Sequence, residues 1–335
     1  MIGVARPGSG SMPRVLTWHV HGSYLYYLSR ARCQFILPTR PGPAEGYGGR
    51  SGDFDWPDNV IEVPAEAVRD MDFDVVLTQS RRNYLEDRFD LLTVDQLRRP
   101  LVHLEHDPPR ESPAETRHFV EDERALLVHV TPFNALMWDS GAVPARVIEH
   151  GVEVPAHLAF RGDRPRAITA VNNLARRGRR LGPDVFDRVA SRVPVDLVGM
   201  NAKDRDGIEG LRRRALFALE VRYRCFFYPV RYTSLGLAVL EAMMLGLPVV
   251  GLATTELATV IQNGRSGYID TDIDRLTGHV RRLVHNREEA ARLGAGARAA
   301  ALNRFSIERF ADEWTTVLED VASRPQPGLS SRRVA

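Results

Sequence analysis

The chain has 335 residues, 44% hydrophobic and 26% charged, which is long enough for two domains that each bury a core. Its 45 basic and 43 acidic residues nearly cancel, which argues against a nucleic-acid-binding surface. No apolar run reaches the roughly 20 residues that span a bilayer, and we see no transmembrane segment or secretion signal. Cys33 and Cys225 lie in apolar runs without metal-ligand spacing. These features predict a cytoplasmic protein.

Short β-branched and aromatic runs alternate with helical segments along the whole chain. The runs are residues 15–20, 33–38, 59–64, 74–80, 101–106, 126–131 and 145–150, then 167–173, 195–200, 225–230, 248–253 and 267–270. Buried strands that alternate with helices are typical of parallel sheets covered on both faces. The sequence therefore predicts an α/β fold of two Rossmann-like, doubly wound domains that face each other across a cleft.

This pattern divides the chain into five parts. Residues 13–158 and 165–304 are expected to form the two domains. Residues 305–323 form a final helix, for which Ser306 is a good N-cap. The polar ends, residues 1–12 and 324–335, are expected to be disordered. Ligands of open α/β sheets bind beyond the carboxyl ends of the strands, so a site is expected in the loops that follow them.

The segment from residue 225 to residue 268 carries the strongest indication of a site. It reads as a buried strand, a polar loop, an apolar helix, a glycine turn and a second strand. Glu241 has apolar neighbours on both sides, which favours a carboxylate that binds something over one that faces solvent. Ser234 and Gly236 precede the helix, whose free N–H groups would suit a diphosphate. Glu241 would then accept hydrogen bonds from the vicinal hydroxyls of a ribose.

Four arginines follow the first strand of the second domain: Arg176, Arg177, Arg179 and Arg180. Guanidinium groups in this place can clamp a diphosphate and stabilise the charge that develops as it leaves. The alternative is a solvated basic loop. The sequence does not choose among the four.

In the first domain, two strands end in segments that contain histidine. His21, Gly22 and Ser23 follow the first strand, and His106 with Asp107 follows the fifth. Gly22 would let a ligand approach the backbone closely, and the His106–Asp107 pair would lie at the cleft. His19, His103 and His129 are interpreted as structural. Three Asp-x-Asp tripeptides, at 53–55, 72–74 and 272–274, are interpreted as surface turns, so no metal site is predicted.

The second half of the chain resembles the GT-B glycosyltransferases, in particular the retaining family 4 (glycosyl transferases group 1). The family signature appears as TSLGLAVLEAMMLGLPVV followed by NGRSGY. VIEHGVEVP resembles the segment near the family's hinge, and FSIERFADEW resembles the terminal helix that returns to the first domain. The resemblance covers about residues 125–322.

The resemblance implies a transferase that moves a sugar from a nucleotide-diphosphate sugar to a hydroxyl acceptor, with retention and without a metal. No cofactor beyond this co-substrate is implied. Glu241 would bind the ribose, and Gly236 and Leu237 would meet the diphosphate. His106 matches the family's cleft histidine, and we count His106, Arg177 and Glu241 as the catalytic candidates. The first domain would bind the acceptor through the 21–23 segment and Asp107; a glycan, a lipid-linked glycan and a small molecule all fit.

Three departures from the family pattern bear on function. Thr233 replaces the first glutamate of the motif, which contacts the donor sugar in the family. Asn173 stands near the usual phosphate-binding arginine. Thr255 and Glu256 replace a Gly-Gly pair, so Glu256 is expected to contact the donor sugar instead. The Thr233 change leaves open a non-catalytic sugar-nucleotide or glycan-binding protein; a nucleotide-sugar epimerase or hydrolase would need a further pair of acid/base carboxylates.

Overall fold

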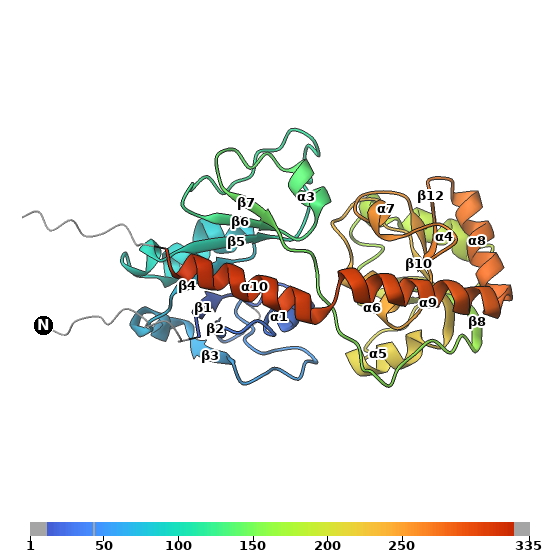
Figure 1. The fold of residues 1–335 in the computed structure, drawn as a ribbon, viewed down its shortest axis with the longest axis horizontal. Helices are drawn as coiled ribbons and strands as arrows, with labels where there is room; N and C mark the ends of the chain where they lie inside the picture. Colours follow the sequence, from blue (N-terminus) through green and yellow to red (C-terminus); the bar gives the residue numbers. More distant parts are fainter. Residues whose placement is uncertain (1–11, 43, 325–335) are drawn as a thin grey trace, which may run out of the picture.

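The computed structural model describes residues 12–42 and 44–324, and within them the predicted α/β architecture is confirmed (Figure 1). The predicted disordered ends fall almost entirely outside the described residues. The first sheet is wholly parallel, in the order β3-β2-β1-β4-β5-β6-β7. Its strands are β1 Arg14–Thr17, β2 Gln34–Thr39, β3 Val60–Pro64, β4 Val75–Thr78, β5 Leu101–Glu105, β6 Leu126–His129 and β7 Ala145–Val147.

The second sheet is also parallel, in the order β12-β11-β10-β8-β9. Its strands are β8 Arg164–Ala170, β9 Val195–Val198, β10 Tyr223–Tyr228, β11 Val249–Leu252 and β12 Gly267–Asp270. Every run predicted from the sequence overlaps one of these strands. In both sheets the chain reverses its direction of winding beside the first strand, and such a reversal opens a crevice at the carboxyl ends of the strands.

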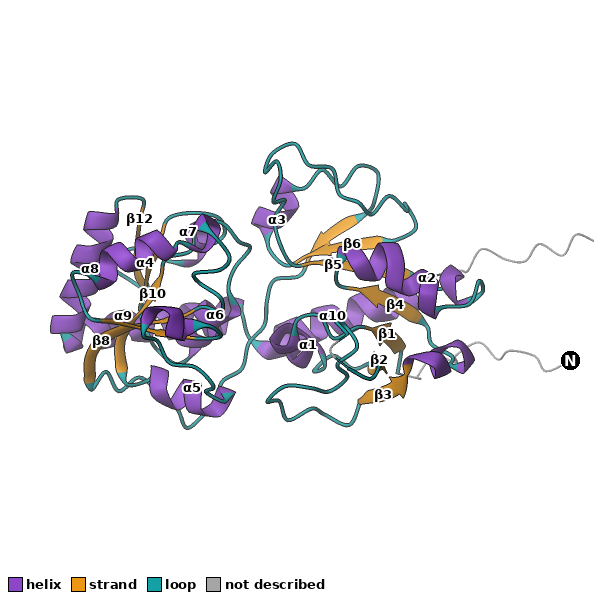
Figure 2. Ribbon diagram, turned by 180° about the vertical axis from the view of Figure 1, so that it is seen from behind, coloured by secondary structure: helices purple, strands orange, loops and turns teal. Residues whose placement is uncertain are grey.

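Helices cover the sheets and connect the two domains. In the first domain these are α1 Gly22–Leu28, a π-helical turn Asn83–Asp87 that leads into α2 Arg88–Leu91, α3 Pro132–Met137, and 3₁₀ turns at Ala65–Asp70 and Gln96–Arg98. In the second they are α4 Pro183–Ala190, α5 Arg213–Glu220, α6 Leu237–Met244, α7 Leu257–Val260, α8 Ile273–His285 and α9 Arg287–Arg304, with 3₁₀ turns at Arg179–Leu181 and Ala202–Arg205. α4 packs against α8 and α6 against α9. Figure 2 shows α1 and α6 facing each other where the domains meet.

The final helix, α10 Ile307–Ala322, returns to the first domain, as predicted (Figure 1). Ser306 caps it by accepting a hydrogen bond from the backbone N–H of Arg309 at 3.3 Å. Its apolar stripe is buried on α1, where Trp314 Nε1 donates to Tyr24 Oη at 3.2 Å. This helix therefore fastens the end of the chain to the first domain.

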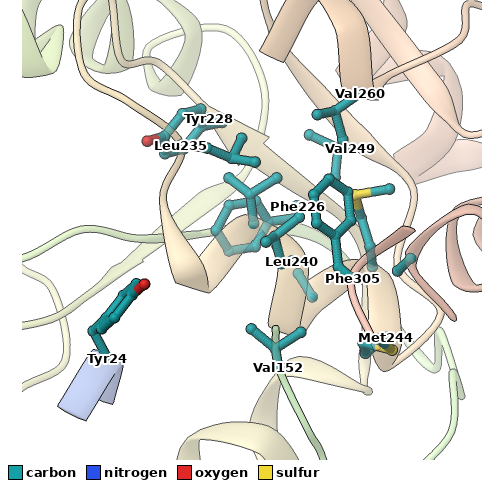
Figure 3. Close-up of a cluster of buried hydrophobic side chains, with 14 of the residues drawn as sticks. Tyr24, Val152, Phe226, Tyr228, Leu235, Leu240, Met244, Val249, Val260 and Phe305 are labelled. Atoms are coloured by element: carbon teal, nitrogen blue, oxygen red, sulfur yellow. The ribbon is translucent and has the colours of Figure 1, made fainter. Parts of the chain in front are cut away.

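One apolar cluster continues from the first domain into the second (Figure 3). Tyr24 of α1 belongs to it together with Phe226 of β10 and Leu240 of α6. Val152, in the connection between the domains, and Phe305, between α9 and α10, are buried in the same cluster. The domains therefore share packed side chains around the two places where the chain passes between them, at Val152 and at Phe305. Across the described residues, no helix combines the length and apolar character needed to cross a bilayer.

Candidate active site

A cavity of about 450 Å³ lies at the carboxyl ends of β8 and β9, between the two domains. Its walls are Ser23, Asp53 and Phe54 of the first domain and Ala170, Asn172, Val198, Gly199, Met200, Ile208, Gly210, Leu211, Arg213, Leu216, Leu237, Ala238 and Glu241 of the second. Predicted residues Ser23, Leu237 and Glu241 thus share one cavity. The mixture of apolar walls and a few polar groups is typical of a small-molecule site.

Glu241 is 8% exposed on α6 and is held by groups from both domains. Tyr27 Oη donates to Glu241 Oε1 at 2.6 Å, and Arg213 Nη2 donates to the same oxygen at 3.1 Å. Oε2 has no hydrogen-bond partner within residues 12–42 and 44–324, and the side chain lines the cavity. The carboxylate therefore offers one acceptor oxygen to a ligand in the cavity.

Sequence reasoning missed Arg213 and Tyr27. The guanidinium of Arg213 stacks 4.7 Å from the Phe217 ring centroid and 5.0 Å from that of Tyr27. Its backbone N–H donates to Asp53 Oδ2 at 2.9 Å, and the neighbouring Arg214 pairs with Asp55. The first Asp-x-Asp tripeptide is therefore an interdomain contact as well as an exposed turn. Nothing in the RRR run, residues 212–214, distinguishes the arginine that is bound by Glu241.

A second carboxyl group lies behind this cluster. Glu220, at the end of α5, is 1% exposed, and within the described part of the chain its Oε2 is buried without a hydrogen-bond partner. Burial raises its pKa well above the usual range, and the nearby negative charge of Glu241 raises it further. Glu220 therefore favours its neutral, protonated form more strongly than an exposed carboxyl group does.

The four arginines after β8 separate into two kinds. Arg176 pairs with Asp204 at 3.1 Å and Arg179 with Asp184 at 3.3 Å, both on the exposed surface. Arg180 points toward the first domain, 3.7 Å from Asp107. Arg177 forms no ion pair among the described residues, and its charge lies close enough to His21 to lower the pKa of that histidine, after the larger effect of burial. Arg177 is thus the one of the four without an ion pair among the described residues, and Arg180 is the one that faces the first domain.

The loop before α6 is shaped by a close contact. Gly236 is the N-cap residue, and a Cβ there would lie 2.8 Å from the hydroxyl of Tyr228, so only glycine fits without a shift. Ser234 is buried, whereas Thr233 is partly exposed. Across the described residues, no side-chain hydrogen bond fixes Thr233. Loop and helix N-terminus together present backbone N–H groups beside the cavity.

The predicted histidines of the first domain meet at the cleft. The rings of His21 and His106 lie 4.4 Å apart, and His106 is 4.7 Å from the Tyr24 ring. His106 Nε2 is 3.2 Å from Gln79 Oε1. Burial lowers the pKa of both histidines, and their mutual proximity lowers that of His106 further, so both rings are neutral at pH 7. Gly22 has a packing reason to lack a side chain, because a Cβ would lie 2.8 Å from His19 Nε2.

Glu105 holds the turn that carries His106 and Asp107. It accepts hydrogen bonds from the Asp107 backbone N–H at 2.9 Å and from His118 Nε2 at 3.1 Å. Burial alone would raise its pKa, but the neighbouring imidazoles of His103 and His118 lower it well below its usual range. His103, Glu105 and His118 are spaced like metal ligands. However, His118 Nδ1 accepts from the Val120 N–H at 3.1 Å, which places its proton on Nε2 and leaves no lone pair there for an ion.

Two predicted donor-binding residues lie in hydrogen-bonded loops. Glu256 is 1% exposed and accepts from Arg304 Nη2 and from the Phe133 N–H, both at 2.9 Å. The preceding Thr255 has φ +51°, a backbone conformation that favours glycine. Asn173 also has positive φ, and it accepts a hydrogen bond from Asn201, which ties the loops after β8 and β9 together. The roles of these residues toward a donor stay predictions.

Comparison with known proteins agrees with this architecture. A sucrose-phosphate synthase from Thermosynechococcus elongatus matches 93% of this chain and 99% of its own, with a TM-score of 0.65 and 15% identity. Anabaena HepE, solved in complex with UDP-glucose, matches 92% and 100%, with a TM-score of 0.67 and 13% identity. A glycosyltransferase from Rickettsia africae matches 94% and 100%, with a TM-score of 0.62 and 11% identity. The chain therefore has the GT-B fold.

Sequence comparison is more specific but shorter. Residues 214–300 match the family described as Glycosyl transferases group 1. An N-acetyl-alpha-D-glucosaminyl L-malate synthase from Bacillus anthracis is 31% identical over 91 residues, 26% of this chain and 24% of that protein. The match thus spans about a quarter of the curated relative. The predicted resemblance to glycosyl transferases group 1 is confirmed over residues 214–300, within a chain that has the GT-B fold.

Proposed function

We propose that the protein transfers a sugar from a nucleotide-diphosphate sugar to a hydroxyl acceptor, with retention of the anomeric configuration and without a metal ion. The observation that carries the proposal is Glu241, a buried carboxylate that lines the interdomain cavity and has hydrogen bonds from the described residues on one oxygen alone. A ribose with two vicinal hydroxyl donors suits that open acceptor. The HepE structure, which contains UDP-glucose, supports a donor of this class.

The leaving diphosphate would lie between the N-terminus of α6 and the arginines after β8. The Arg177 and Arg180 guanidinium groups supply positive charge, and the backbone N–H groups after Gly236 supply hydrogen bonds. Such preorganised donors stabilise the charge that develops on the leaving group. In this proposal these groups take the part that a divalent cation plays in other transferases.

The acceptor would enter from the first domain. His106, Asp107 and the 21–23 segment lie on that side, and Glu105 fixes the turn that presents two of them. Neutral His106 can hydrogen-bond the acceptor or the donor sugar without adding charge. A glycan, a lipid-linked glycan and a small molecule remain acceptor classes of the proposal, and the cytoplasmic location stays a prediction.

The test is a thermal-shift screen of the purified protein against UDP, GDP, ADP, TDP and CMP and the matching sugar nucleotides. A ligand at 100 times its dissociation constant stabilises the protein by about 2.7 kcal/mol, which raises the melting temperature. We expect one diphosphate to give a shift that Glu241→Ala abolishes. The absence of a shift with every nucleotide would contradict the proposal. Release of the diphosphate with and without added acceptors then separates transfer from hydrolysis.

Thr233 favours one alternative, a non-catalytic sugar-nucleotide-binding protein. It replaces a glutamate of the family motif, and the structure gives its side chain no hydrogen bond across the described residues. Thr233→Glu separates the two functions. A working site shaped around threonine loses transfer activity in this variant, whereas a degenerate site has no activity to lose.

A further inference from the structure

Two hydrogen bonds from different domains converge on one oxygen of Glu241. Tyr27 belongs to α1 of the first domain, and Arg213 is the first residue of α5 in the second. Their bonds to Oε1 measure 2.6 and 3.1 Å. Because both bonds use Oε1, they restrain the carboxylate and leave Oε2 without a hydrogen bond among the described residues, in a side chain that lines the cavity.

The first domain also restrains Arg213 itself. Asp53 Oδ2 accepts from the Arg213 backbone N–H at 2.9 Å, and the Tyr27 ring lies 5.0 Å from the guanidinium carbon. Asp53 and Phe54 continue along the cavity wall. The first domain thus touches Glu241 directly through Tyr27 and indirectly through Asp53 and Arg213.

The chemistry of the contact suits a fixed donor. Burial and the Glu241 charge raise the pKa of the Tyr27 hydroxyl well above its usual range, so the hydroxyl keeps its proton and donates it. A charged acceptor makes such a hydrogen bond stronger than a neutral one. A carboxylate held in this way presents Oε2 in one orientation, which lowers the entropy lost when a ribose binds.

We propose that Tyr27 and Arg213 are positioning residues that orient Glu241 toward the ribose, so that the first domain completes the ribose site of the second. The inference rests on the proposed function, because it concerns the same cavity. It adds that nucleotide affinity depends on contact between the domains through a residue of α1. In consequence, a donor bound at Glu241 stabilises the arrangement of the domains seen here.

The test measures dissociation constants by calorimetry for UDP, GDP and ADP and for their 2′,3′-dideoxy counterparts, which lack both ribose hydroxyls. We expect Tyr27→Phe to weaken binding of the preferred ribonucleotide about tenfold, the value of one hydrogen bond to a charged group. Binding of the dideoxynucleotide should change less than twofold. Arg213→Met should show the same ribose-dependent loss.

Tyr26→Phe is the matched control. Tyr26 precedes Tyr27 on α1, and its hydroxyl accepts from Arg30 Nη2 at 2.6 Å, with no hydrogen bond to Glu241. Its variant should bind both nucleotide forms as the wild type does. In a Glu241→Ala background, which has no acceptor for the Tyr27 hydroxyl, Tyr27→Phe should have no further effect, since its action passes through the carboxylate.

Three results would overturn the inference. Unchanged affinity in Tyr27→Phe shows that the hydroxyl does not orient the site. An equal loss for ribo- and dideoxynucleotides shows a general structural role. Tighter ribonucleotide binding shows that Tyr27 occupies the place of the ribose. By contrast, a wild type that binds none of the nucleotides in the thermal-shift screen refutes the proposed function itself, and the inference with it.

Discussion

Two buried glutamates of the second domain contact the first domain, and their surroundings differ. Glu241 is 8% exposed, shares one oxygen with Tyr27 and Arg213, and lines a cavity with the other. Glu256 is 1% exposed, and its two oxygens are bound by Arg304, Thr259 and the Phe133 N–H. One carboxylate has an oxygen without a hydrogen bond from the described residues, and the other is hydrogen-bonded on both oxygens.

The difference shows which property identifies a binding carboxylate. Burial and contact with the other domain are common to both residues. An unsatisfied acceptor beside a cavity belongs to Glu241 alone of the two. Glu256 pairs with Arg304, which also pairs with Glu149 of the first domain at 2.5 Å, and its predicted contact with a donor sugar stays a prediction.

The largest effect should come from Glu241→Ala. Loss of the hydrogen bonds to both ribose hydroxyls should weaken nucleotide binding by more than about 100-fold, because each bond to a charged acceptor contributes roughly 1.5 to 3 kcal/mol. Calorimetric titration with the nucleotide found in the screen measures the change. If Glu241→Ala binds as the wild type does, the comparison between the two glutamates loses its functional meaning.

Glu256→Gln should lower stability and leave nucleotide affinity unchanged, the opposite of what we expect for Glu241→Ala. It removes the charge that faces Arg304, and we expect the free energy of unfolding to fall by about 2 kcal/mol. This is less than for a fully buried pair, because Arg304 keeps Glu149 and is partly exposed. Urea unfolding measures the loss, and titration of the folded variant should give the wild-type nucleotide affinity. A selective loss of donor-sugar binding would instead indicate that Glu256 contacts the donor sugar.

Arg177→Met should sharpen the assignment of the diphosphate. We expect about a tenfold weaker affinity for a nucleoside diphosphate and no change for the corresponding nucleoside, because only the former meets the guanidinium. Arg179→Met is the matched control, since Arg179 pairs with Asp184 on the surface. Equal losses in the two variants would indicate a general electrostatic effect of the basic loop.

The smallest effect concerns His150, which is buried beside the Tyr24 ring. Burial lowers its pKa to about 4. On acidification the unfolded chain takes up a proton near pH 6.5, and the native chain does so only near pH 4. The contribution of His150 to the free energy of unfolding is therefore fully present above pH 6.5 and decreases as the pH falls below 6.5.

The free energy of unfolding of the wild type decreases between pH 7.5 and pH 6.0, and His150→Gln should make this decrease smaller by about 1 kcal/mol. Urea unfolding of the wild type and the variant at both pH values measures this difference. Parallel pH profiles for the two proteins would show that His150 does not titrate as its burial requires.

Much of the architecture could be predicted from local pattern. The apolar runs overlap the observed strands, because a strand buried on both faces must be apolar along its length. Ser306 caps α10 through a bond to a residue three positions away. The burial of Glu241 also follows locally, because its helix is apolar on every side and has no solvent face to offer it.

The partners of Glu241 could not be predicted in this way. Tyr27 lies 214 residues away and Arg213 lies 28 residues away, and neither stands out among its neighbours in the YLYYL and RRR runs. The same holds for the arginines after β8, where the loop conformation alone directs two toward exposed carboxylates and one toward Asp107.

The sequence by itself determined the alternation of strands and helices, the family signature and the presence of one buried carboxylate, because these depend on residues close together in the chain. Only the tertiary structure decided which groups touch that carboxylate and which oxygen stays open. Hydrogen bonds act over about 3 Å between residues that folding brings together. Their choice of partner is therefore set by how the two domains pack.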